Sequence, residues 1–198
     1  MERKAKLHTI ADVSLGQTFR ERAETDKPIS GIRLIQIKDI REGELSDVSG
    51  LPYADIEPSK LKVKLIDGDL LLPLRGTRTE AMIFRKGGSR EDVTTTNQVA
   101  IIRPKDGLVT LDYLHWFFNS DIGSLTLDSI RTAATIPNIS VRNLVEITLP
   151  VPDDEAQKEV VAIYNNWRLQ KENLHELIIN GEAIMASAAQ KILSRGLV

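Results

Sequence analysis

The chain has 198 residues, 41% of them hydrophobic and 27% charged, which suits one domain with a normal core and an extended element better than two full domains. It has no cysteine, only scattered histidines (His8, His115 and His175), no apolar signal core at the N-terminus and no apolar run approaching ~20 residues, so we expect a cytoplasmic protein without disulfides, metal centre or membrane span. The net charge of −2 disfavours a stand-alone nucleic-acid binder, because such domains usually carry a basic excess that neutralises phosphates.

The first part of the chain has the pattern of a strand-rich, mixed α+β domain. Residues 32–40 predict a strand with Ile35 and Ile37 on one face and Gln36 and Lys38 on the other. Short apolar runs separated by turn signals predict further strands at residues 61–65, 70–74, 81–84, 99–102 and 145–149. Two helices are predicted at residues 111–119 and 122–130, the first with a core cluster of Trp116, Phe117 and Phe118.

After Pro152 the composition changes to that of one long helix. Asp153, Asp154 and Glu155 place negative charge where a helix N-terminus favours it, and from there to about residue 193 there is no proline. Apolar residues recur at steps of mostly three, four and seven, which predicts a coiled-coil-like helix ~60 Å long. We expect a partner helix, most simply from a second copy of the chain, to cover this stripe; the alternative is that the helix folds back over its own domain.

The junction between these two parts carries a family resemblance. Asn138-Ile139-Ser140, Leu144, Ile147, the run Leu149-Pro150-Val151-Pro152 and Gln157 resemble the junction in Type I restriction–modification specificity subunits, where a target-recognition domain ends and a spacer helix begins. The chain departs from the usual pattern at Ala156, where the family has an acidic residue, and at Asp153-Asp154, where a further Pro and Leu are common. Earlier elements are also similar to the family, namely residues 32–40, 67–72 with Arg75-Gly76, and 97–104.

The resemblance implies a half-length specificity subunit. Residues 1–152 would be the DNA target-recognition domain and residues 153–198 the spacer and dimerisation helix, whereas full-length members hold two of each. A homodimer would rebuild that arrangement with two-fold symmetry and read a bipartite palindromic site on double-stranded DNA. The implied partners are an adenine DNA methyltransferase (modification) subunit and a possible restriction subunit. The chain itself would be catalytically silent and need no cofactor.

Base and phosphate contacts require Arg, Lys, Asn, Gln, Ser or Thr side chains on exposed loops. Basic residues concentrate in the middle of the chain, with ten Lys/Arg against five Asp/Glu between residues 60 and 105, which is typical either of an anion-binding region or of an ordinary solvated face. The candidate DNA-binding residues are Gln36, Lys38, Arg75, Thr77, Arg78, Lys86, Arg90, Thr95 and Asn97. For residues 75–78 and 86–90 a solvated turn is the alternative, and for residues 94–97 an exposed polar strand.

The helix supplies the candidate dimer interface, which consists of Val160, Ile163, Tyr164, Trp167, Leu174, Leu177, Ile178 and Met185. A second hypothesis gives the chain a different role, as a non-catalytic adaptor or inhibitor that binds another protein through this helix. A nuclease is disfavoured because no Glu-x-Lys follows Pro152-Asp153-Asp154 on a strand. No phosphate loop, no Gly-x-Ser-x-Gly elbow and no methyltransferase cofactor loop occurs, so S-adenosylmethionine and ATP would belong to the partners.

Overall fold

The computed structural model describes residues 3–27, 30–77, 80–105 and 107–195, which divide into two compact units between Gln157 and Lys158. The first unit contains three sheets and four short helices, and the second consists of the remainder of one long helix. The predicted α+β class with a long C-terminal helix is therefore confirmed.

A five-stranded sheet forms the centre of the first unit, in the order β2-β10-β7-β8-β5. Neighbouring strands are antiparallel except β5 and β8, which run parallel. The strand bounds are Ala11–Leu15 for β2, Gly43–Leu45 for β5, Asp69–Pro73 for β7, Met82–Phe84 for β8 and Val99–Pro104 for β10. All five residues of β7 are buried, which explains why its sequence is a continuous apolar run rather than an alternating one.

A second, four-stranded sheet has the order β3-β6-β4-β9, with bounds Glu24–Thr25, Tyr53–Ala54, Ile32–Ile35 and Asp92–Thr95. The prediction of one strand over residues 32–40 is wrong beyond Ile35. Gln36 caps a 3-10 helix, η1 (Ile37–Asp39), because the Asp39 carboxylate accepts a 2.9 Å hydrogen bond from the Gln36 backbone N–H. Gln36 and Lys38 therefore do not share a strand face.

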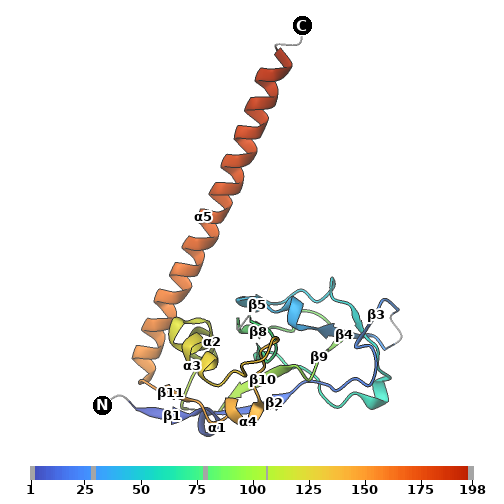
Figure 1. Cartoon of the computed structure of the whole chain (residues 1–198), viewed down its shortest axis with the longest axis vertical. Helices are drawn as coiled ribbons and strands as arrows, with labels where there is room; N and C mark the ends of the chain where they lie inside the picture. Colours follow the sequence, from blue (N-terminus) through green and yellow to red (C-terminus); the bar gives the residue numbers. More distant parts are fainter. Residues whose placement is uncertain (1–2, 28–29, 78–79, 106, 196–198) are drawn as a thin grey trace. The chain divides into compact units, whose positions relative to one another are not determined.

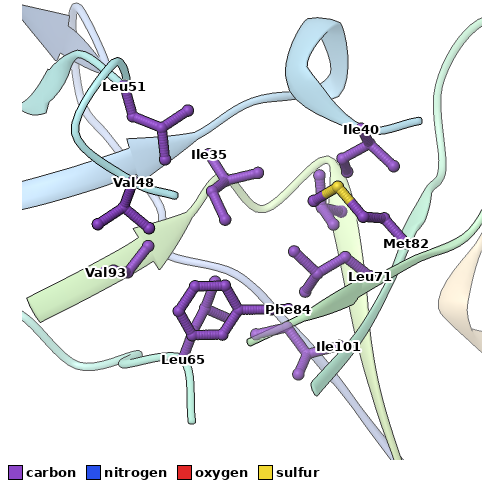
Figure 2. Packing of buried hydrophobic residues seen from close by; sticks show 11 residues of the cluster. Ile35, Ile40, Val48, Leu51, Leu65, Leu71, Met82, Phe84, Val93 and Ile101 are labelled. Atoms are coloured by element: carbon purple, nitrogen blue, oxygen red, sulfur yellow. The ribbon is translucent and has the colours of Figure 1, made fainter. Parts of the chain in front are cut away.

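The two sheets share one hydrophobic core, shown in Figure 2. Ile35 and Val93 come from β4 and β9, and they pack in the same cluster as Leu71, Phe84 and Ile101 from β7, β8 and β10. A smaller cluster of Ile32, Leu34 and Ala54 lies on the four-stranded sheet. This shared core fixes the ends of strands from both sheets relative to one another, including the loops that follow β4, β7 and β9.

The helices of the first unit are α1 (Leu7–Ile10), α2 (Leu111–Asn119), α3 (Asp121–Ser129) and α4 (Val141–Leu144), and a 3-10 turn, η2, spans Pro58–Lys60. Both α2 and α3 lie close to the predicted bounds. The Asn119 amide links α2 to the sheet, because it accepts from the Ala81 N–H at 2.8 Å and donates to the Ala81 carbonyl at 3.0 Å. Phe117 and Phe118 are buried as predicted, whereas Trp116 is only partly buried and packs against Tyr113.

The third sheet joins the beginning of the domain to its end. β1 (Lys4–Lys6) pairs antiparallel with β11 (Thr148–Pro150), as Figure 1 shows. The predicted strand at residues 145–149 is therefore displaced, because its first residues belong to the turn after α4.

The long helix α5 spans Asp154–Arg195 without interruption, close to the predicted bounds. Among the described residues, no helix combines the length and apolarity that crossing a membrane requires.

Candidate nucleic-acid interface

The chain leaves β7 in a turn that is tied to a distant segment. Leu74 donates to the Gln98 carbonyl at 2.9 Å and accepts from the Ile139 N–H at 2.8 Å, while the Gly76 N–H donates to the Pro137 carbonyl at 2.9 Å. Arg75 and Asn138 thereby form an antiparallel pair between two flanking hydrogen bonds. In this type of pair the two side chains lie on the same face and approach closely, with Cα atoms about 4.5 Å apart.

Four exposed polar residues gather at this end of the sheet, and we call them the Arg75 edge: Arg75, Thr77, Asn97 and Asn138. Asn97 lies in the tight turn between β9 and β10, in which the Val99 N–H donates to the Thr96 carbonyl at 3.0 Å. Among the described residues, neither the Arg75 guanidinium nor the Asn138 side-chain amide has a protein partner. The edge thus presents a cation and an amide on a backbone held by hydrogen bonds from three segments.

A buried arginine lies against the backbone of the Arg75 edge. The Arg131 side chain is 11% exposed, and its Nη1 donates to the Gly76 carbonyl. Its Nε is 3.1 Å from Oδ1 of Asp128, a contact that is not aligned as a hydrogen bond, and its buried Nη2 has no partner among the described residues. Asp128 is itself 59% exposed, so it compensates the Arg131 charge only partly.

Lys86 lies at the opposite end of the same sheet, and Arg90 follows it in the loop before β9. β8 runs antiparallel to β7, so Lys86 lies beside Asp67, whose carboxylate accepts from the Lys86 backbone N–H at 2.9 Å. A five-residue strand such as β7 is about 16 Å long. The sequence-predicted residues therefore form two separate groups rather than one cluster, and the structure brings together only Arg75, Thr77 and Asn97.

Gln36 and Lys38 share a carboxylate of their own domain. Glu24 Oε2 accepts from the Gln36 side chain at 2.6 Å and lies 2.9 Å from Lys38 Nζ. The hydrogen bond from Lys38, followed by that from Gln36, lowers the pKa of Glu24, and the same contact raises the pKa of Lys38. Both residues follow the end of β4, next to the end of β9 and hence on the side of the β9–β10 turn. A DNA contact by either side chain requires it to leave Glu24.

Thr95 corrects the prediction of an exposed polar strand at residues 94–97. Thr94 and Thr95 are completely buried, and the Thr95 hydroxyl donates to the Ile35 carbonyl at 2.8 Å. Its hydroxyl thus joins β9 to β4 inside the core and is not accessible to a ligand. Arg78 lies outside the described residues.

A surface groove of about 800 Å³ between residues 16–22 and 55–63 was not predicted from the sequence. Its lining combines cationic and anionic side chains, namely Arg20, Arg22, Lys60, Lys62, Glu21, Asp55 and Glu57. The two segments are distant in sequence and neither carries a motif, so no local signal could have identified the groove.

The predicted interface residues of α5 are mostly exposed. The exposed fraction is 52% for Trp167, 72% for Ile163 and 60% for Ile178, and Leu174, Leu177 and Met185 are similar. Val160 and Tyr164 are partly buried. The large apolar side chains of α5 are therefore available to another protein surface.

Comparison with known proteins identifies relatives through structure and not through sequence. No family model matches the chain, and no curated protein matches its sequence significantly. A structure of a Type I restriction–modification system described by its complex assembly and conformational transition aligns with a TM-score of 0.64 and 17% identity, over 87% of this chain and 39% of that one. The HsdS subunit from Thermoanaerobacter tengcongensis aligns with a TM-score of 0.61 and 17% identity, over 88% of this chain and 39% of that one.

The type IIG restriction endonuclease BpuSI also matches, with a TM-score of 0.56 and 9% identity, over 80% of this chain and 26% of that one. The present chain thus spans about two fifths of the length of the Type I structures that it matches. At these identities the likeness establishes the fold, with its strand-rich domain and long C-terminal helix.

Proposed function

We propose, from the HsdS-type fold of this chain, that it confers DNA sequence specificity on a Type I restriction–modification system. The observation that carries the proposal is the structural match to an HsdS subunit over 88% of the chain. The Arg75 edge supports it, because an unpaired arginine and exposed amides on a rigid strand end are groups that contact bases and phosphates. In this proposal residues 1–152 recognise DNA and residues 153–198 set the spacing.

The chain would act with partners that perform the chemistry. We expect an adenine DNA methyltransferase subunit to methylate the site that this chain selects, and a restriction subunit to join where one exists. The net charge of −2 fits a protein that shares phosphate contacts with such partners, and it predicts weak, strongly salt-dependent binding by the chain alone.

We further propose that two copies pair through α5. The exposed apolar side chains of its stripe lose contact with water only if another surface covers them. Two copies related by a two-fold axis would hold two identical recognition domains in opposite orientation. Their target would then be a bipartite palindrome with a fixed spacer.

The order of side-chain sizes along α5 favours an antiparallel pair. Residues at seven-residue intervals are large in the first part of the helix and small in the second: Val160, Trp167 and Leu174 are followed by Gly181 and Ala188. If the two-fold axis passes between residues 177 and 178, Trp167 lies opposite Ala188 of the other copy and Leu174 opposite Gly181. A parallel pair in register would place two Trp167 side chains together and leave a void where two Gly181 residues meet. The crowded Trp167 layer and the empty Gly181 layer would each pack poorly, which disfavours the parallel pair.

Cysteine cross-linking tests this register, because the chain contains no cysteine. We expect a Leu174→Cys chain mixed with a Gly181→Cys chain to form a disulfide-linked heterodimer on mild oxidation. Neither variant alone should cross-link efficiently. A new Cβ at Gly181 meets no atom of its own chain within 4 Å, so the substitution is tolerated sterically. Self-cross-linking of each variant would indicate a parallel pair instead.

A charge on the stripe tests the dimer itself. Ile178→Asp should convert the dimer to a monomer in analytical ultracentrifugation, because the apolar contact could no longer form. Leu169→Asp is the matched control, since Leu169 is also exposed but lies on the other side of the helix. A dimer that survives Ile178→Asp contradicts the proposed interface.

Methylome sequencing tests the function. The chain is expressed together with a candidate adenine methyltransferase in a host that lacks DNA methylation. The control is the same host with the methyltransferase but without the chain. The proposal predicts adenine methylation at a two-part symmetric sequence only when the chain is present. An identical methylation pattern in both hosts would contradict it.

The exposed apolar stripe also fits the second candidate function, a protein-binding adaptor or inhibitor of a restriction complex. This candidate predicts that the chain co-purifies with a restriction or modification subunit and shows no sequence-dependent DNA contact. Selection from a randomised duplex pool separates the two candidates, because only a specificity protein enriches a motif.

A further inference from the structure

We infer that the Arg75 edge holds a backbone phosphate of the DNA and does not read bases. The inference rests on the proposed function and makes it more specific. It also narrows the prediction that Arg75 contacts DNA, because it assigns this residue a contact that is independent of sequence.

The Arg131 guanidinium carries a positive charge that the domain compensates only in part. Arg131 is almost fully buried, and the one carboxylate in contact with it, Asp128, is mostly exposed to water. Its Nη2 is buried without a partner among the described residues. Burial of an incompletely compensated guanidinium is unfavourable, and an anion bound nearby would offset that cost.

This charge lies next to the Arg75 edge. Arg131 Nη1 donates to the Gly76 carbonyl, so the guanidinium touches the peptide that follows Arg75. Arg131 also pairs with Ile139, the residue after Asn138. The Arg131 guanidinium therefore lies against the Gly76 peptide, and the Arg131 backbone pairs with the segment that holds Asn138. From there the cation raises the local potential at the Arg75 edge without contacting a ligand itself.

The surface of the Arg75 edge carries the paired residues Arg75 and Asn138. Arg75 and Asn138 face the same side, and both side chains are exposed and free of partners among the described residues. Together they offer guanidinium and amide N–H donors, which suit the oxygens of one phosphate. A base edge is neutral and gains little from a fixed cation beneath it, whereas a phosphate carries a full charge at every step of the duplex.

Salt-dependent binding of the full chain to two 40-bp duplexes of unrelated sequence tests the inference. Arg75→Ala should weaken binding to both duplexes equally, by about eightfold at 0.1 M salt, and reduce the slope of log K against log salt by about 0.9. Asn138→Ala should weaken both by about two- to tenfold with the slope unchanged, because it removes a neutral donor. Arg131→Met should reduce the slope by less than Arg75→Ala does, and Arg131→Lys should restore it.

The slope separates a binding role from a structural one, since a partly unfolded variant loses active protein but keeps the slope of the remainder. Lys105→Ala is the matched control, because Lys105 follows the far end of β10 and should leave the slope unchanged. An unchanged slope in Arg75→Ala, or loss of binding to one duplex only, would overturn the phosphate assignment. If the unmodified chain binds neither duplex, the proposed function itself fails.

Discussion

The two ends of the five-stranded sheet differ in how their basic residues are compensated. At the Lys86 end, Arg85 contacts Glu44 at 3.0 Å, Arg103 contacts the buried Asp69 at 2.5 Å, and Lys105 lies 3.4 Å from Asp12. At the Arg75 end, the surface arginine has no carboxylate partner among the described residues, and the buried Arg131 has a partial one. The number of basic residues in a segment therefore does not by itself locate an anion site. The two ends differ in Arg131, a largely buried cation whose one contacting carboxylate is exposed.

Removing two charges from the segment around Arg75, or two from residues 86–90, tests this comparison with the largest expected effect. Arg75→Ala with Arg78→Ala should weaken duplex binding by about 60-fold at 0.1 M salt, since about two counterions are no longer released. Lys86→Ala with Arg90→Ala removes the same charge from the segment that follows β8 and should cost about twofold. Fluorescence anisotropy with a labelled 40-bp duplex measures both, and a reversed order would contradict the assignment of the two ends.

Replacement of Asp69 should lower the stability of the fold and leave duplex binding unchanged. Its carboxylate is completely buried and bonds to both Nε and Nη2 of Arg103 and to the Ile66 N–H. We expect Asp69→Asn to lower the free energy of unfolding in urea by about 2 kcal/mol, because a buried pair loses one partner while Arg103 stays partly hydrated. The control, Asp12→Asn, should change it by less than about 0.5 kcal/mol, since Asp12 is 76% exposed. Equal losses of unfolding free energy in the Asp69 and Asp12 variants would contradict a special role of the buried carboxylate.

Glu44→Gln sharpens the comparison from the acidic side. The hydrogen bond with Glu44 is the main cause of the raised pKa of Arg85, so the substitution leaves a cation at the Lys86 end without its closest partner. If DNA contacts the other end, duplex affinity should change by less than about twofold. A larger gain in affinity, measured in the same titrations, would place DNA at the Lys86 end as well.

The smallest effect concerns Glu24, whose pKa is lowered chiefly by its hydrogen bond with Lys38. A carboxylate with a lowered folded-state pKa stabilises the fold above its unfolded pKa, near 4.5, and loses this contribution as the pH falls through the folded value. Because the pair is exposed, we expect less than about 1 kcal/mol. Chemical unfolding at a series of pH values should show that Glu24→Gln lowers stability at pH 7 and that the difference from the unmodified chain shrinks as the pH falls below the unfolded pKa.

Patterns confined to short segments were predicted well from the sequence. The strand at β7 and the helix α2 lie within a residue or two of their predicted bounds, because a buried apolar run and amphipathic periodicity are local signals. The 42-residue helix α5 also follows from its periodicity and the absence of proline. The strand predicted over residues 32–40 ended early, since the capping box between Gln36 and Asp39 competes with strand pairing.

The candidate site was predicted only in part, because its geometry depends on pairs that are distant in sequence. Arg75 lies beside Asn138 across more than 60 residues, and Arg131 contacts Gly76 across 55. Nothing near Arg75 in the sequence indicates these neighbours. Thr95 was misassigned for a related reason: its polarity suggested exposure, whereas a carbonyl on β4 satisfies its hydroxyl inside the core.

The pairing of β1 with β11 brings the two ends of the first unit side by side. Its entry and exit strands are hydrogen-bonded neighbours, with Lys4 opposite Pro150 and Lys6 opposite Thr148. A block with adjacent ends can be exchanged for a homologous block, or duplicated along a chain, with only two nearby joints to rebuild. If the proposed function holds, grafting residues 4–150 onto the helix of another protein of this fold should therefore transfer the DNA preference of the block. New specificities would then arise by exchange of whole blocks as well as by point changes.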